Sequence, residues 1–306
     1  MPAGTPAFSS WVRVTATTPR WRASSSSERT GPKGAGLTLF SVEAAPEAVT
    51  AGPTRRLRLL VAYDGSGYHG FALQPGVATV GGALAGALER YLRHTVELTC
   101  AGRTDTGVHA WGQVVSFDAR ADADPKALQR AVNRALRPSI VVREAAVADP
   151  GFDARRSATA RVYRYTVRND PVADPFTAST AWHVAAPLDL AAMRLACDPL
   201  HGEHDFSSFC RRPPVPDASL VRVIRDARWV DLGDGILRFQ IEASSFCHQM
   251  VRSVVGTLVE VGLGKKRAGQ MASIIRARSR ASAGQPAPAH GLCLWEVKYQ
   301  ETRSTW

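Results

Sequence analysis

A regular succession of strand-like and helix-like segments, beginning near residue 55, is the feature that most constrains how this chain folds. Strand-like segments carry alternating or continuous apolar residues and are expected at 56–63, 95–101, 112–119, 139–147, 161–169, 221–232, 235–243 and 291–299. Helix-like segments repeat apolar residues every three to four positions and are expected at 80–94, 125–137, 188–200, 245–263 and 266–278. This mixture predicts an α+β fold in which helices cover one face of a sheet.

Residues 1–54 differ from the rest of the chain, because they are rich in Ser, Thr, Ala, Gly and Pro and show no sustained apolar period. They predict a disordered N-terminal extension. An organellar transit peptide, which is typically rich in Arg and Ser and poor in acids, is the disfavoured alternative. We expect an N-terminal α+β half over 55–165, a C-terminal α+β half over 166–300 and a tail at 301–306.

The charge balance is strongly basic, with a formal net charge of +11 and 33 Arg against 5 Lys. The forked guanidinium suits phosphate, which favours a polyanionic partner, although a codon bias gives the same excess of Arg. No apolar run approaches the ~18 residues of a membrane span, so no membrane segment is expected. The five cysteines are odd in number and widely spaced without a C-x-x-C pair, which argues against a disulfide framework and against a thiolate zinc site. We therefore expect unpaired thiols in a reducing compartment, and a cytoplasmic location.

The segment AYDGSGYHGF, residues 62–71, contains G-x-G-x-x-G directly after a strand-like segment, which is the opening pattern of a dinucleotide-binding fold. Such a fold needs a helix at the last glycine and an acidic residue about 20 residues further on. Here Pro75 and Gly76 break any such helix, and the first acidic residue downstream, Glu89, lies within a helix-like segment. The pattern therefore predicts a sharp turn, and a contact of this loop with a ligand stays open.

The densest polar segment is AGRTDTGVHAWGQ, residues 101–113, which places Arg103, Asp105 and His109 in one loop between two strand-like segments. A neighbouring cation keeps a carboxylate ionised, and loops on rigid strands commonly carry catalytic groups. These features make Asp105 a candidate catalytic carboxylate. On this segment alone, the favoured interpretation is that Asp105 only caps its own turn through main-chain amides.

Two further segments carry basic residues in suggestive positions. In the helix-like segment 245–263, His248, Arg252 and Gly256 are spaced four residues apart, and the glycine allows close backbone approach beside an Arg that reaches into a cleft. Residues 152–165 interleave four arginines, Arg155 among them, with tyrosines, which suits phosphate contacts and stacking on an unpaired base. A solvated helix face and an ordinary amphipathic strand are the alternatives.

These segments together resemble the tRNA pseudouridine synthase A (TruA) family over about residues 56–299. GRTDTGVHA at 102–110 differs from the family's GRTDAGVHA only at Thr106. YDGSGYHGF at 63–71, SATARVYRY at 157–165 and FCHQMVRSVVG at 246–256 also match, in the expected order and spacing. The chain departs from the family pattern at Phe71, Ala72, Gly81 and Asp153, none of which matches a catalytic residue of the family.

The resemblance implies an isomerase that converts uridine to pseudouridine in the anticodon stem-loop of tRNA, at the uridines conventionally numbered 38, 39 and 40. It implies Asp105 as the nucleophile, Arg252 as its ion-pair partner, and Arg103 as the basic residue that helps hold the target nucleotide out of its stack. Attack on C1′, attack on C6 and removal of the C2′ proton stay open as routes. The implied substrate-binding residues are Tyr163, His109, Arg155 and His248, with the Tyr163 ring on the uracil.

The resemblance further implies two ferredoxin-like halves with antiparallel sheets around a central basic cleft, a homodimer, and neither a metal nor an organic cofactor. Two alternatives to this enzyme remain. A glycosidase requires a second carboxylate, for which Asp64 and Glu242 are weak candidates. A non-catalytic tRNA-binding chaperone fits the composition but gives no reason for Asp105 and Arg252 to occur together.

Overall fold

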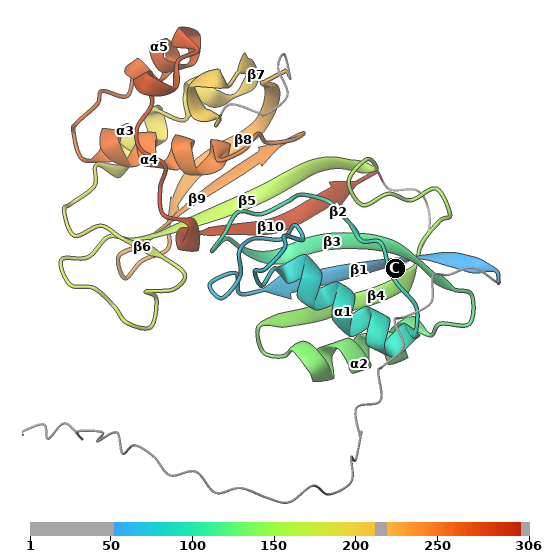
Figure 1. Cartoon of the computed structure of the whole chain (residues 1–306). Helices are drawn as coiled ribbons and strands as arrows, with labels where there is room; N and C mark the ends of the chain where they lie inside the picture. Colours follow the sequence, from blue (N-terminus) through green and yellow to red (C-terminus); the bar gives the residue numbers. More distant parts are fainter. Residues whose placement is uncertain (1–51, 212–218, 301–306) are drawn as a thin grey trace, which may run out of the picture. The chain divides into compact units, whose positions relative to one another are not determined.

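One mixed sheet contains all ten strands that the computed structural model describes within residues 52–211 and 219–300 (Figure 1). The strand order is β4–β1–β3–β10–β5–β9–β8–β7, with β2 paired to β3 and β6 to β5. The strands are β1 (Thr54–Tyr63), β2 (Thr99–Cys100), β3 (His109–Arg120), β4 (Ile140–Val147), β5 (Ala158–Arg168), β6 (Trp182–His183), β7 (Gly202–Asp205), β8 (Val221–Asp231), β9 (Ile236–Ala243) and β10 (Leu292–Tyr299). Two of the pairings are parallel, β3 with β10 and β5 with β6, and the others are antiparallel.

The helices gather on one face of this sheet (Figure 1). They are α1 (Val80–Leu92), α2 (Pro125–Leu136), α3 (Leu190–Leu195), α4 (Met250–Gly262) and α5 (Gln270–Ala277). Alternation along the strands supplies the matching apolar face, since Leu57, Leu59 and Val61 of β1 and Phe239 and Ile241 of β9 are fully buried in one core. The predicted α+β class, a sheet flanked by helices, is confirmed.

The parallel pair of β3 and β10 joins the strands of the two predicted halves. Cys293 and Leu294 of β10 lie opposite His109 and Ala110 of β3. Gly112 permits this approach, because a Cβ atom there would lie 2.3 Å from the main-chain oxygen of Trp295. The two sheets that the resemblance implies are therefore continuous. β5 also runs across the expected boundary at residues 165 and 166.

Several element bounds differ from those predicted. The helix predicted at 245–263 begins only at Met250, because Gln249 adopts a left-handed conformation with φ 61°. His248 therefore precedes the helix and does not share a helical strip with Arg252. The strand predicted at 95–101 is reduced to β2, and the helix predicted at 188–200 stops at Leu195, before a 3₁₀ turn that contains Pro199.

The predicted extension up to residue 51 and the predicted tail at 301–306 lie outside the described residues. Within the described part, no helix combines the length and the apolar character that crossing a membrane requires. The division into an N-terminal and a C-terminal half stays a prediction.

Candidate active site

The Asp105 loop, residues 101–108, connects β2 to β3 and packs against the glycine loop at 62–71. The hydroxyls of Tyr63 and Thr104 share a hydrogen bond of 2.8 Å, and the amide of Phe71 donates to the carbonyl of Thr104 at 3.1 Å. Gly70, with φ 84°, lies so close that a Cβ atom would be 2.7 Å from the same carbonyl. The glycines thus allow two loops to pack together, which fixes the main chain on which Asp105 stands.

Residues from the far end of the chain reach the Asp105 carboxylate. Nη1 of Arg252 lies 3.6 Å from Oδ2, and Nε2 of His248 lies 3.4 Å from Oδ1. The Asp105 side chain is 29% exposed and that of Arg252 is 17% exposed, so water screens this pair less than it screens a surface ion pair. The structure therefore brings together the Asp and the Arg that the sequence predicts as partners.

Arg252 is oriented by the segment that precedes β10. Its Nε donates to the carbonyl of Ala287 at 2.7 Å, and the amide of Ala287 donates to the Arg252 carbonyl at 2.9 Å. Gly256, one turn further along α4, makes this contact possible, because a Cβ atom there would lie 1.8 Å from the main-chain oxygen of Gln285. The predicted close approach at Gly256 is confirmed, with a segment of the same chain as the approaching backbone.

Tyr163 lies on β5 beneath the Asp105 loop, and its hydroxyl would be 3.7 Å from a Cβ atom at Gly102. The ring is buried and meets Phe246 edge to face, with 5.1 Å between ring centroids. Burial, with a smaller contribution from the charge of Asp105, raises the pKa of Tyr163 well above its ordinary value. The phenol therefore stays neutral next to the carboxylate.

Arg161 is a residue that the sequence reasoning did not single out. It is buried, and its guanidinium donates five hydrogen bonds to main-chain carbonyls. The acceptors are in Ala101, at the start of the Asp105 loop, in Arg155 and Ala158, and in Ser244, before the His248 segment. Arg161 thus ties three site segments together. Its position could have indicated this burial, because residues 161, 163 and 165 alternate along the strand and so lie on the same face as Tyr163 and Tyr165.

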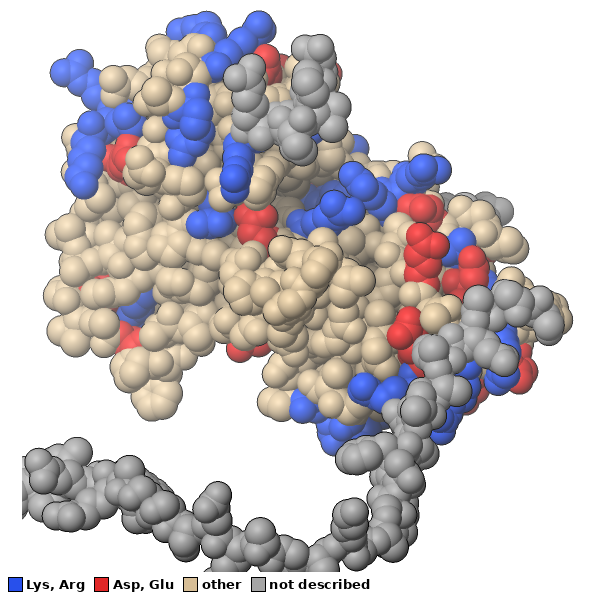
Figure 2. Space-filling model, in the orientation of Figure 1, with Lys and Arg blue, Asp and Glu red and all other residues tan. Residues whose placement is uncertain are grey.

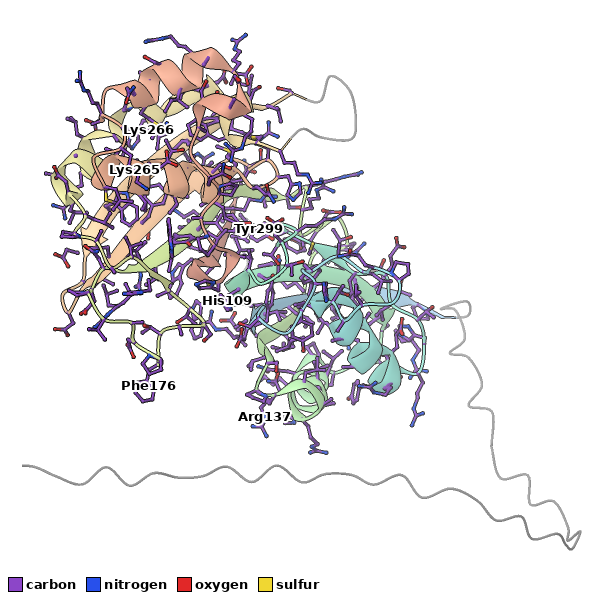
Figure 3. The ribbon with its side chains drawn as sticks, turned by 60° about the vertical axis from the view of Figure 1, so that its left-hand side comes forward. His109, Arg137, Phe176, Lys265, Lys266 and Tyr299 are labelled. Atoms are coloured by element: carbon purple, nitrogen blue, oxygen red, sulfur yellow. A yellow bond between two sulfur atoms is a disulfide. The ribbon has the colours of Figure 1, made fainter. Side chains whose placement is uncertain are left out.

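His109 is predicted to contact substrate, whereas the structure buries it between segments of the chain (Figure 3). Its Nε2 lies 3.0 Å from the carbonyl oxygens of Ser179 and His290, and both of these contacts require a proton on that nitrogen. Its Nδ1 accepts from the amide of Gly65 at 3.1 Å. Both ring nitrogens are occupied, which makes His109 a connector at the start of β3.

Arg103 and Arg155 have exposed side chains at the rim of the Asp105 loop. Within the described residues neither guanidinium forms a hydrogen bond or an ion pair, so both are available to phosphate. Asp153 fixes the main chain at Arg155, because the Asp153 carboxylate accepts hydrogen bonds from the amides of Arg155 and Arg156 at 2.8 and 2.7 Å. Figure 2 shows basic side chains over the C-terminal helices and across the middle of this face.

The prediction that the cysteines stay unpaired is wrong for one pair. Cys210 and Cys247 form a disulfide, with 5.8 Å between their Cα atoms. The 37 residues between them gave the sequence no spacing signal, because the pair is created by the fold. Cys100, Cys197 and Cys293 are free.

The predicted site residues lie away from the two best-formed surface pockets of the described chain. Two surface pockets lie at Asn169 and Gly235 and at His201 and His204, and their linings include no predicted site residue. Within residues 52–211 and 219–300, no group of three or more His, Cys, Asp or Glu side chains is arranged to hold a metal ion. The polar groups that converge around Asp105 are therefore the candidate site.

Comparison with known proteins identifies the family of this chain. A family model described as tRNA pseudouridine synthase matches residues 59–155 and 196–300. The chain is 40% identical to "tRNA pseudouridine synthase A" of Brevibacillus brevis over 245 residues, which cover 80% of this chain and 100% of that protein. Proteins of the same name from Halalkalibacterium halodurans and Bacillus subtilis are 43% and 39% identical, covering 78% and 80% of this chain and 90% and 99% of theirs. The chain belongs to the tRNA pseudouridine synthase family of isomerases.

Proposed function

We propose that this protein converts uridine to pseudouridine in tRNA, with Asp105 as the catalytic nucleophile. The observation that carries the proposal is the placement of the Asp105 carboxylate, 3.6 Å from Arg252, in a loop whose Gly102 lies next to the hydroxyl of Tyr163 on β5. A guanidinium at this distance attracts the carboxylate and limits its rotation. The three groups come from segments far apart in sequence, which a turn-capping role for Asp105 would not require.

The reaction is an isomerisation, so every atom of the nucleotide is retained. The N1–C1′ bond breaks, the base rotates, and C5 bonds to C1′. Attack of the carboxylate on C1′, its attack on C6 and removal of the C2′ proton all need an ionised carboxylate at the junction of sugar and base. A carboxylate in this role divides one difficult step into two easier ones.

The surrounding residues suit a nucleotide turned out of its stack. Tyr163 offers a neutral aromatic ring beside Asp105, and Phe246 at its edge keeps that ring in place. Arg103 and Arg155 present free guanidinium groups at the rim of the loop, where they would contact the phosphates on either side of the target. His248 stands at the carboxylate from the opposite side and would border the same nucleotide.

The finer features of the proposal are the anticodon arm as substrate, uridines 38, 39 and 40 as targets, a homodimer, and a cytoplasmic location. The formal charge of +11 supports a long polyanionic substrate over an isolated nucleoside, because a tRNA arm carries many phosphates. Homodimerisation would extend the basic surface available to one tRNA.

The test is to replace Asp105 with Asn and to map pseudouridine in unmodified tRNA. Asp105→Asn keeps the size of the side chain and removes its charge, so we expect tRNA binding to persist and pseudouridine formation to fall by more than about a thousandfold. Asp64→Asn is the matched control, since this carboxylate is 56% exposed and faces His109. It should retain pseudouridine formation.

Other outcomes would identify the alternatives. Pseudouridine formed by Asp105→Asn at the wild-type rate would refute the catalytic assignment. Cleavage of the glycosidic bond that depends on both Asp64 and Asp105 would indicate a glycosidase. Binding of tRNA by the wild-type protein without any modification would indicate a chaperone.

A further inference from the structure

The Cys210–Cys247 disulfide lies immediately next to the site in sequence and in space. Cys247 precedes His248, whose imidazole reaches Asp105, and Cys210 precedes Arg211. The amide of Arg211 donates to the carbonyl of His248 at 3.0 Å, so the two cysteine segments are also joined by a main-chain hydrogen bond. The covalent bond therefore fixes the main chain from which His248 projects.

Few other contacts fix this short stretch. His248 is 47% exposed, and within the described residues its side chain has no polar partner other than Asp105. Gln249, which follows, is in a left-handed conformation and does not cap α4 with its side chain. Phe246, on the other side of Cys247, holds the Tyr163 ring edge to face. The position of residues 246–248 thus determines how two predicted substrate-binding side chains meet the carboxylate.

We propose that Cys210 and Cys247 are a reversible oxidative modification site, and that their disulfide positions His248 against Asp105. This proposal rests on the proposed function for its effect on catalysis, but not for the chemistry of the cysteines. His248 acts here as a positioning residue, which limits the rotation of the carboxylate from the side opposite Arg252.

The step is a thiol–disulfide exchange with a small-molecule disulfide as oxidant. Cys247 is partly exposed and Cys210 is 3% exposed, so the Cys247 thiolate attacks the small disulfide first and releases one thiol. The Cys210 thiolate then attacks Sγ of Cys247 in the mixed disulfide and releases the second thiol. Two S–H bonds are lost and one S–S bond forms, while the oxidant takes up two electrons and two protons. A small dithiol reverses the step.

The remaining cysteines are poorly suited to this exchange. Burial raises the pKa of Cys197 to about 12 and that of Cys293 to about 11, and burial also raises the pKa of Cys100. Their thiolate fractions at neutral pH are correspondingly small. None of these three forms a disulfide in the structure. Exchange should therefore select the Cys210–Cys247 pair.

The first test treats the full-length protein with glutathione disulfide or with dithiothreitol, alkylates free thiols and identifies the peptides by mass spectrometry. Glutathione disulfide should join the Cys210 and Cys247 peptides and leave three alkylated cysteines, whereas dithiothreitol should leave all five alkylated. Cys293→Ser is the matched control and should form the same joined peptide. Failure of the joined peptide to form, or joining through another cysteine, would overturn the proposal.

The second test compares catalysis and main-chain protection in the two redox states of the unmutated protein. Reduction should lower kcat for pseudouridine formation by about 3- to 30-fold, since positioning errors of up to 1 Å cost up to about a hundredfold, and should change KM less than kcat. Amides 246–250 should exchange faster after reduction. Cys210→Ser should match the reduced protein in either buffer.

These readouts separate the two proposals. Equal kcat and equal amide exchange in both redox states would overturn the positioning role, even if the disulfide forms. Absence of pseudouridine in both states would refute the proposed function, while amide exchange would still decide whether the disulfide fixes residues 246–250. A change in KM alone would contradict an action through the carboxylate.

Discussion

Replacing Gly256 by alanine places a methyl group 1.8 Å from the main-chain oxygen of Gln285. Real Cβ atoms essentially never approach a heavy atom closer than 3.0 Å, so the two segments must separate by about 1.2 Å. The obstacle is main chain and cannot rotate away as a flexible side chain would. The next residues of that segment include Ala287, which orients Arg252, so the displacement passes directly to the ion pair with Asp105.

The magnitude follows from three contributions. Alanine in a helix interior gains about 1 kcal/mol over glycine. Overpacking costs about 1–3 kcal/mol, and loss of the two hydrogen bonds between Arg252 and Ala287 costs about 1 kcal/mol each. The net result is a loss of about 2–4 kcal/mol in the free energy of unfolding. Pseudouridine formation should fall about 10- to 100-fold at temperatures where the variant is still folded.

The assay is urea denaturation together with tRNA modification, and Gly86→Ala on α1 is the matched control. A Cβ atom at Gly86 would meet nothing closer than 4.0 Å, where it touches only the end of the Arg90 side chain. This substitution should therefore stabilise the protein by about 0.5–1 kcal/mol and leave activity unchanged. The reasoning would be refuted if Gly256→Ala stabilised the protein as well, or if it kept wild-type activity.

Two further substitutions test the surroundings of the site. Tyr165→Phe removes a buried hydroxyl that donates to the carbonyl of Pro288 at 2.8 Å, so the free energy of unfolding should fall by about 1–2 kcal/mol in urea denaturation, and no change would contradict the bond. Although burial alone would raise it, the pKa of Asp205 is lowered by hydrogen bonds from Ser207 and by Arg278. The ionised Asp205 carboxylate therefore stabilises the fold above its unfolded pKa of about 3.9, and this effect is lost as the pH falls through the folded pKa. The difference in unfolding free energy between the wild type and Asp205→Asn should shrink between pH 6 and pH 3, and a constant difference would contradict this.

Local patterns made most of the fold predictable. Strands whose apolar side chains alternate, such as β1 and β9, and helices with a continuous apolar stripe, such as α1, were found within a few residues of their bounds. What these strands and helices share is that their physical cause lies within about ten consecutive residues. The pairing of Asp105 with Arg252 came instead from the resemblance to the family, because no local pattern connects two residues so far apart in the chain.

The remaining features depend on contacts between distant segments. Arg161 connects segments only because the fold brings the carbonyls of Ala101 and Ser244 to its guanidinium. His109 does so only because the fold brings the carbonyls of Ser179 and His290 to its ring. The late start of α4 comes from one residue in a left-handed conformation, Gln249. Glutamine as a residue type gives no sign of that conformation. Periodicity predicts which face of an element is apolar. It does not predict which main-chain carbonyls accept hydrogen bonds from a buried guanidinium.

Three residues that depart from the family pattern, Phe71, Gly81 and Asp153, have structural roles near the site. Phe71 and Gly81 are in contact, since the Gly81 amide donates to the Phe71 carbonyl and a Cβ atom at Gly81 would lie 2.5 Å from that oxygen. Phe71 is 4% exposed and belongs to the core. Asp153 caps the turn that presents Arg155. All three residues therefore shape the main chain beneath or beside the site and leave the groups around Asp105 unchanged, so we expect them to alter stability and tRNA contacts more than the chemical step.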